Sequence, residues 1–324
     1  MKAVILKEFG PAENLIVEKV PLPIPSESEV LINVKAFSVN PVDAHIRGMK
    51  DYWDFITLGA PSEPYALLGW DIAGVVTKVG KGVTRFKEGD EIFGMVKFLG
   101  AGYGYAEYVS APETDLALKP SNISFEEAAA ATMAAQTAYV SLVRYGEVKK
   151  GDKVVITGAS GGVGHYAVQI AKHLGAYVIG VASGENRDFV LSLGADEYVD
   201  YKTQNFEDLV KDADLVHDAV WRHDESHISK GVNALRSGGT LLSLMVHPTP
   251  EFIENAKTEK NVIVRRMNVT DTTDHQGDVE AIRALLESGE VKSYVSQTFA
   301  FEDTYKAHKQ VETHATKGKV VVKL

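Results

Sequence analysis

A glycine-rich segment that follows an apolar run has the residue types and spacing to bind a phosphate group. Residues 154–156 (VVI) are typical of a buried parallel strand, and residues 158–164 (GASGGVG) follow directly. Glycines accept positive φ and let backbone amides approach a ligand closely. Apolar residues then recur at helical spacing over 167–174, so the N-terminus of a helix should face the same point. We predict a strand, a glycine turn and a helix that bind a dinucleotide phosphate.

The spacing of this turn leaves a second interpretation open. The glycines follow the pattern GxxGxxG, whereas the commoner dinucleotide fingerprint is GxGxxG. Glycine-rich turns also join strands to helices in loops that bind nothing. The strand before the turn and the helix after it favour the binding interpretation.

The choice of cofactor is read at the end of the next predicted strand, 177–181, where an acidic residue would hold the ribose of NAD. Here the strand is followed by Ser183, and the first carboxylate, Glu185, comes in the loop. Arg187 could meet a 2′-phosphate, because a guanidinium group pairs well with phosphate oxygens. We therefore predict NADPH. The alternative for Arg187 is a solvated cation at the start of a helix.

Length and composition limit the classes of protein. The chain has 324 residues, 45% of them hydrophobic, which suits two globular domains. A net charge of −10 without clustered Lys or Arg argues against nucleic acid as a partner. The longest apolar run, 128–143, is too short and alanine-rich to span a bilayer and predicts a buried helix. With no basic apolar leader at Met1, we expect a cytoplasmic protein without a membrane partner.

The elements around the glycine turn predict an α/β fold with two domains. Up to residue 123 short strand patterns alternate with Pro and Gly clusters, as in a mainly antiparallel β domain. Ser124 and Glu127 form a capping box that opens the alanine-rich helix. From residue 151 strands and helices alternate as in a doubly wound parallel sheet. The six predicted strands are 153–157, 177–181, 197–199, 215–219, 240–245 and 262–264.

After these strands, 270–277 reads as a loop and 278–288 as an amphipathic helix, and strand patterns return near 296–301 and 320–322. We therefore expect residues 1–123 to form the first domain, 124–268 a Rossmann domain, and 269–324 to return to the first domain. The active site would lie in the cleft between the domains.

The order and spacing of several short strings identify a family. They cover essentially the whole chain: NPVD at 40–43, GWDIAGVV at 69–76, AAQTAY at 134–139, GASGGVG at 158–164, LGADEYVDY at 193–201 and GKVVV at 318–322. Together they resemble the zinc-independent quinone oxidoreductases (zeta-crystallin-like) of the medium-chain dehydrogenase/reductase superfamily. The resemblance implies a GroES-like β domain, a Rossmann domain, bound NADPH and a homodimer.

The resemblance also implies roles for individual residues. Asn40 and Thr137 would lie near the nicotinamide, and Lys319 falls in the terminal GK of the family. The remaining implied cofactor contacts are Gly158, Ala159, Ser160, Gly161, Gly162, Val163, Ser183, Arg187 and Tyr201. Simpler interpretations stay open: an Asx turn at Asn40, a helix hydroxyl bonded to its own backbone at Thr137, and an apolar edge residue at Tyr201.

The departures from zinc-dependent relatives concern metal ligands. Those enzymes carry cysteine ligands and a Gly-His-Glu segment, whereas this chain has no cysteine and has Gly69-Trp70-Asp71 in the matching segment. We therefore expect no catalytic zinc. His223 and His227 imitate a metal-binding pair, but we read 223–227 as a polar loop. The residues after Asp218 are Ala219-Val-Trp-Arg222, where the family usually has glycines.

The chemistry expected without a metal is hydride transfer from NADPH to an electron-poor acceptor, either a quinone or an α,β-unsaturated carbonyl. The catalytic residues stay open: Asn40 and Tyr52 are candidates, and Tyr105 is a further candidate proton donor, with ordinary packing as the simpler interpretation of both tyrosines. The alternatives are a catalytically silent nucleotide-binding regulatory protein and a zinc alcohol dehydrogenase, which the missing ligands oppose.

Overall fold

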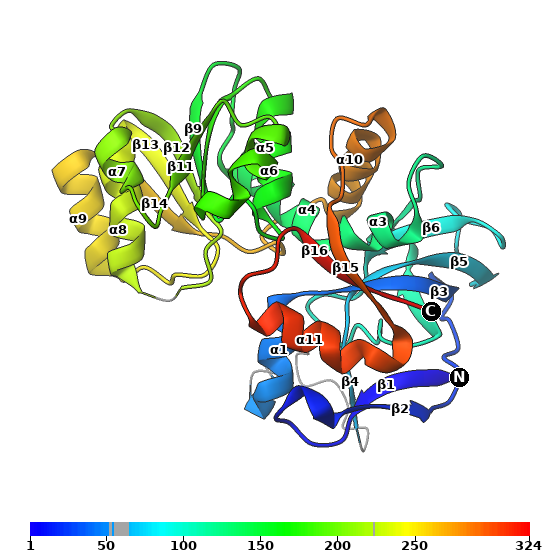
Figure 1. Cartoon of the computed structure of the whole chain (residues 1–324). Coiled ribbons are helices and arrows are strands. Elements are labelled where there is room, and N and C mark those ends of the chain that lie inside the picture. Colours follow the sequence, from blue (N-terminus) through cyan, green and yellow to red (C-terminus); the bar gives the residue numbers. More distant parts are fainter. Residues whose placement is uncertain (52–53, 55–64, 223) are drawn as a thin grey trace. The chain divides into compact units, whose positions relative to one another are not determined.

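The computed structural model describes residues 1–51, 54, 65–222 and 224–324, and the chain divides into two compact units. Unit 1 comprises Met1–Met133, Thr273–Gly289 and Ser293–Leu324, and unit 2 comprises Ala134–Thr272 and Glu290–Lys292. Unit 1 therefore contains both ends of the chain, which are blue and red in Figure 1.

Unit 1 is built on two sheets. The larger has the order β15-β16-β3-β5-β6-β8, with β7 paired to β3, and the smaller has the order β2-β1-β4. Every pairing is antiparallel except that of β15 with β16. The strands are β1 Lys2–Leu6, β2 Leu15–Lys19, β3 Glu29–Val39, β4 Ala66–Leu67, β5 Asp71–Val79, β6 Glu91–Met95, β7 Tyr108–Pro112, β8 Leu116–Leu118, β15 Val295–Ala300 and β16 Lys319–Lys323. The predicted antiparallel β domain is confirmed.

Four described helices accompany these sheets: α1 Pro41–Gly48, α3 Phe125–Ala130, α10 His275–Ser288 and α11 Thr304–Glu312. The predicted capping box opens α3, because the Glu127 amide donates to Ser124 Oγ at 3.1 Å and the Ser124 amide donates to Glu127 Oε2 at 2.8 Å. Helices α1 and α11, far apart in the sequence, lie side by side (Figure 1). Their contact matters for the buried polar groups described below.

Unit 2 is a parallel sheet of the doubly wound type, as predicted, with the order β11-β10-β9-β12-β13-β14. The strand order reverses between β9 and β12, so this pair forms the topological switch point. The strands are β9 Lys153–Thr157, β10 Tyr177–Ala182, β11 Glu197–Asp200, β12 Ala213–Asp218, β13 Leu235–Ser243 and β14 Ile263–Arg266.

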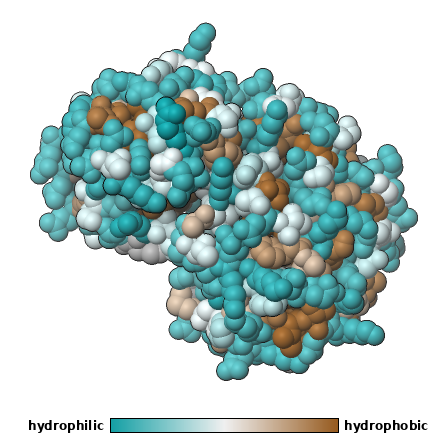
Figure 2. Space-filling model, in the orientation of Figure 1, coloured by the Kyte–Doolittle hydropathy of each residue, from teal (hydrophilic) through white to brown (hydrophobic). Residues whose placement is uncertain are grey.

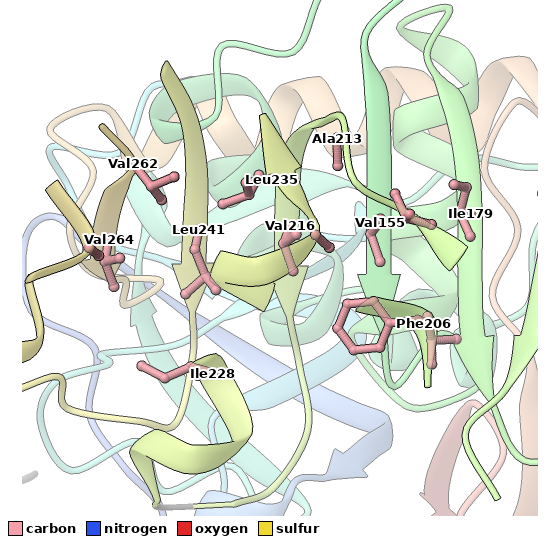
Figure 3. Packing of buried hydrophobic residues seen from close by; sticks show 14 of the residues in the cluster. Val155, Ile179, Phe206, Ala213, Val216, Ile228, Leu235, Leu241, Val262 and Val264 are labelled. Atoms are coloured by element: carbon pink, nitrogen blue, oxygen red, sulfur yellow. The ribbon is translucent and has the colours of Figure 1, made fainter. Parts of the chain in front are cut away.

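The core of unit 2 lies where one face of this sheet meets its helices. Val155, Val216 and Leu241 come from adjacent strands and pack with Phe206 of α7 and Ile228 of α8 (Figure 3). Because side chains alternate along a strand, these positions share one face, and the other face is left to α5 and α6 (Figure 1). The helices are α4 Met133–Tyr139, α5 Gly164–His173, α6 Arg187–Ser192, α7 Phe206–Leu209, α8 Glu225–Ala234, α9 Pro250–Lys260 and the π-helix η3 Val140–Tyr145.

The predicted helix over 128–143 is not continuous. Helix α3 ends at Ala130, and α4 begins at Met133. The break has a tertiary cause, because the Met133 amide donates to the Asp71 carboxylate at 3.1 Å, so a side chain from β5 caps the second helix. The prediction of one continuous helix was wrong for this reason.

Two other expected loops are helical at one end. Helix α10 begins at His275, three residues before the predicted start, because Asp274 accepts from the Gly277 amide at 2.9 Å. The loop predicted over 223–227 is wrong from Asp224 onward, since Asp224 accepts from the His227 amide at 3.0 Å and caps α8. His223 lies outside the described residues.

Hydrophilic residues cover most of the visible face of the molecule, and the hydrophobic areas on it are small and separate (Figure 2). No helix in the described ranges has the length and apolar character needed to cross a membrane.

Candidate functional site

The glycine turn of unit 2 has the backbone that the sequence predicts. Gly158 follows β9 with φ of +66°, a conformation that strains residues with a side chain. Gly164 begins α5, and a Cβ atom there would lie 2.0 Å from the Gly158 carbonyl oxygen. Gly158 therefore permits the bend, and Gly164 permits the close approach of helix to strand. Sequence reasoning did not include Gly164 among the site residues, although it closes the GxxGxxG pattern.

The amides of this turn divide into two groups. The amide of Ala159 donates to the Val181 carbonyl at 3.1 Å and the amide of Gly161 to the Gly158 carbonyl at 2.9 Å, so both stabilise the turn. The amides of Gly162 and Val163 donate to no group in the described part of the chain. They precede α5, so two backbone donors and the positive end of a helix lie together, which suits a phosphate.

The end of β10 carries a carboxylate that the sequence interpretation placed in the following loop. Ser183 is buried, and its hydroxyl donates to Glu185 Oε1 at 2.9 Å and accepts from Asn186 at 3.0 Å. Glu185 therefore lies directly at the strand end, because the 3-10 helix η4 (Gly184–Asn186) turns the chain back there. A carboxylate at this position accepts hydrogen bonds from ribose hydroxyls and repels a 2′-phosphate.

Cations also surround this strand end. Arg187 begins α6, is 62% exposed and lies 3.6 Å from Asp188. Lys202, which sequence reasoning missed, lies 3.7 Å from Glu185 and follows the exposed Tyr201 at the end of β11. The parallel pairing of β10 with β11 brings these residues to one edge of the sheet, although Glu185 and Arg187 follow β10 and Tyr201 and Lys202 follow β11.

Unit 1 holds a second group of predicted residues in a buried polar cluster. Asn40 donates to Asp71 Oδ2 at 2.7 Å, and its amide oxygen accepts from Lys319 Nζ, which lies 3.6 Å from Asp71. Ser38 donates to the same oxygen of Asp71 at 2.6 Å. Burial lowers the pKa of Lys319, and the nearby Asp71 carboxylate opposes that shift. The structure thus brings Asn40 and Lys319 together through Asp71.

Asp71 stands in the segment that matches the zinc-ligand segment of related dehydrogenases. Its carboxylate accepts from Ser38, Asn40 and the Met133 amide and pairs with Lys319. These contacts use its acceptor positions within the protein. Among the residues that the structure describes, no cluster of three or more His, Asp or Glu side chains could hold a metal ion.

The other predicted site residues have separate surroundings. Thr137 is almost fully buried in α4. Tyr105 is fully buried and stacks on Phe37 with ring centroids 4.5 Å apart, as the packing interpretation had it. Tyr52 lies outside the described residues.

The switch point of unit 2 carries a polar cluster that sequence reasoning missed. Asp218, buried at the end of β12, accepts from the Thr157 hydroxyl, from Ser243 at 3.3 Å and contacts His227 Nε2 at 3.0 Å. The carboxylate therefore joins the ends of β9, β12 and β13 to α8. Because Thr157 directly precedes Gly158, this cluster supports the glycine turn. The only sequence signal was the His223–His227 pattern.

Comparison with known proteins agrees with both units. A family model described as "Alcohol dehydrogenase GroES-like domain" matches residues 26–121, and one described as "Zinc-binding dehydrogenase" matches residues 193–322. An NADPH-dependent alkenal/one oxidoreductase, chloroplastic, of Arabidopsis thaliana is 35% identical over 99% of this chain and 79% of its own. The quinone oxidoreductase of Sus scrofa is 30% identical over 100% of this chain and 98% of its own.

A solved structure is similar to this chain over its whole length. The Escherichia coli quinone oxidoreductase complexed with NADPH is 26% identical to this chain, covers 100% of both chains and has a TM-score of 0.86.

Proposed function

The chain belongs to the quinone oxidoreductases of the medium-chain dehydrogenase/reductase superfamily, and from this we propose that it is an NADPH-dependent reductase of quinones or α,β-unsaturated carbonyls. The observation that carries the proposal is the glycine turn, in which the amides of Gly162 and Val163 and the N-terminus of α5 offer donors to an anion. The relatives are named for reduction of quinones and of alkenals or enones, which fits a cofactor that supplies a hydride.

The proposed preference for NADPH rests on the charges at the ends of β10 and β11. Arg187 and Lys202 would pair with the 2′-phosphate, and the Ser183 hydroxyl would donate to it. Glu185 opposes this arrangement, because its negative carboxylate already accepts the hydrogen bond of the Ser183 hydroxyl. Binding of NADPH therefore requires Glu185 to release both the Ser183 hydroxyl and Lys202, which lies 3.7 Å from it.

The family resemblance supports a place for Asn40 at the reacting end of the cofactor. Asn40 and Lys319 form a rigid pair, because Asp71 fixes both side chains. When bound, the cofactor supplies the hydride, and the protein supplies position and polarity. An acceptor whose double bond is already electron-poor suits a site in which Asp71 is engaged and no cysteine is available.

The test is oxidation of NADPH and NADH followed at about neutral pH with benzoquinone, naphthoquinone and methyl vinyl ketone as acceptors. We expect turnover with at least one acceptor, and a higher kcat/KM with NADPH. Tight nucleotide binding without turnover would instead favour the regulatory alternative. Turnover of simple alcohols that depends on added zinc would favour the zinc dehydrogenase.

Two smaller proposals complete this assignment. The family resemblance supports a homodimer, which sedimentation analysis would test. The cytoplasmic location stays a prediction, since the alkenal/one relative is named as chloroplastic, and localisation of a tagged full chain in its own cells would decide it.

A further inference from the structure

A row of buried polar side chains runs from the surface of α11 towards Asn40. Arg47 of α1 donates to the Gly10 carbonyl at 2.9 Å, pairs with Glu312 and contacts His308 Nδ1 at 3.4 Å. His308 Nε2 contacts the Tyr105 hydroxyl at 3.2 Å. Arg47, Tyr105 and His308 are all buried, and α1 and α11 lie side by side (Figure 1).

The chemistry of Arg47 fixes the direction of these contacts. A guanidinium group only donates, so Nδ1 of His308 must accept, and the ring proton must be on Nε2. Burial and the charge of Arg47 lower the pKa of His308 to about 3, so the ring stays neutral. His308 therefore donates to the Tyr105 oxygen, which leaves the Tyr105 hydroxyl proton for another acceptor.

That acceptor is the carboxyl group of Asp43. Asp43 is fully buried, and its Oδ2 accepts from the Asn40 amide at 2.6 Å. Its Oδ1 is buried and accepts no hydrogen bond from the described part of the chain, and the two groups influence each other, since Tyr105 lowers the pKa of Asp43 and Asp43 raises that of Tyr105. Arg47 thus donates to His308 and His308 donates to Tyr105, which leaves the Tyr105 hydroxyl to act on Asp43, the residue that holds the backbone of Asn40.

We propose that Tyr105 and His308 are positioning residues for Asn40, and that they act by keeping the Asp43 carboxyl group in the form that holds the Asn40 amide. The inference rests on the proposed function, in which Asn40 lies at the nicotinamide end of the cofactor. Asp71 and Lys319 fix the side chain of Asn40, and Asp43 fixes its backbone.

The ionisation of Asp43 makes this link sensitive to pH. Its pKa is raised to about 7: burial is the largest cause and the charge of Asp71 on β5 adds to it, whereas the Asn40 amide, Lys319 on β16 and Tyr105 oppose it. An ionised carboxylate is the stronger acceptor for the Asn40 amide. The position of Asn40 therefore becomes better defined as the pH rises through about 7.

The experiment compares the pH dependence of kcat and KM for NADPH in wild type and variants between about pH 5 and 9. Tyr105→Phe removes the hydroxyl and keeps the ring on Phe37. His308→Leu removes the donor, and His308→Gln can still accept from Arg47 and donate to Tyr105. Asp43→Asn keeps an acceptor for the Asn40 amide and cannot ionise. Thr304→Val is the control, because it removes a buried hydroxyl of α11 that bonds the Phe301 carbonyl at 2.8 Å.

We expect Tyr105→Phe and His308→Leu to move the acid limb of kcat/KM upward by about one pH unit, so that activity falls about tenfold at low pH and little at high pH. His308→Gln should keep the wild-type acid limb of kcat/KM, because glutamine can make both contacts of the ring. The kcat/KM profile of Asp43→Asn should show no acid limb. If His308→Leu does not fold, Tyr105→Phe decides alone.

A second measurement does not depend on turnover. Because the folded chain binds the Asp43 proton more tightly than the unfolded chain, the free energy of unfolding falls as the pH rises from the ordinary pKa of 3.8 to about 7. Asp43→Asn removes this contribution, so its Tm relative to wild type should rise over that range. If Tyr105→Phe and His308→Leu both keep the wild-type pH profile, the inference fails and the proposed function stands. If the wild type turns over no acceptor, the proposed function fails and the inference fails with it.

Discussion

The ammonium group of Lys319 lies 3.6 Å from Asp71 Oδ2, and both side chains are almost completely buried. The pair joins β16, near the end of the chain, to β5. Removing one partner of a buried ion pair leaves the other charge unpaired, which costs about 3–5 kcal/mol. We therefore expect Lys319→Met to lower the free energy of unfolding by about that amount in chemical denaturation.

Lys323→Met is the matched control for Lys319→Met. Lys323 lies on the same strand and pairs with Glu126 at 2.7 Å, but its side chain is 63% exposed. Exposed pairs contribute little to stability, so this variant should unfold like wild type. Equal losses in the two variants would show that the buried pair has no special role.

Arg187→Ala should weaken NADPH binding and leave NADH binding nearly unchanged. The expected loss is about 1.5–3 kcal/mol, since a charge-assisted bond to the 2′-phosphate is removed. Titration of protein fluorescence with each cofactor measures it. Arg236→Ala is the control, because Arg236 pairs with Asp214 near the opposite end of the sheet. A similar loss for both cofactors would reject the assignment of Arg187.

Glu185→Gln should strengthen NADPH binding. Its carboxylate accepts from the Ser183 hydroxyl at 2.9 Å, so the substitution removes a negative charge beside the proposed phosphate. The same change should weaken NADH, because the glutamate is then missing as an acceptor for the ribose. The ratio of the two Kd values is the measurement, and a ratio that moves towards NADH would show that the 2′-phosphate lies elsewhere.

Gly162→Val should abolish cofactor binding in a protein that still folds. A side chain beside the amides of Gly162 and Val163 would collide with a phosphate or displace the turn, whereas Gly162 itself has no positive φ that would strain a side chain. Calorimetry with NADPH and circular dichroism check binding and folding separately. Gly48→Val is the control, because a Cβ atom there meets nothing within 4 Å. A folded Gly162→Val protein with normal NADPH affinity would show that this turn does not hold the phosphate.

Dialysis against a strong chelator should leave turnover intact. The chain has no cysteine, and Asp71 is engaged by Ser38, Asn40 and Lys319 within the protein. Elemental analysis before and after dialysis accompanies the activity measurement. Stoichiometric zinc whose removal stops the reaction would contradict this prediction.

The sequence alone determined the parts of the molecule that local patterns encode. The apolar run of β9, the glycine turn and the helical spacing of α5 follow one another directly, so a parallel strand, turn and helix could be predicted there. The capping box of Ser124 and Glu127 is equally local, since its two hydrogen bonds join residues three apart. The family resemblance added the GroES-like type of the first domain and the implied roles of Asn40 and Thr137.

The tertiary structure alone decided which side chains meet across long stretches of chain. Asp71 interrupts the alanine-rich helix, because its carboxylate accepts from the Met133 amide at the start of α4. It also pairs with Lys319, and neither partner is near Asp71 in the sequence. The same holds for Tyr105, which looks like a loop hydroxyl in sequence and is buried against His308 in the fold. Periodicity reports only which face of an element is apolar. The partner of a buried polar group depends on how the sheets bring distant strands together, because burial without a partner costs too much free energy.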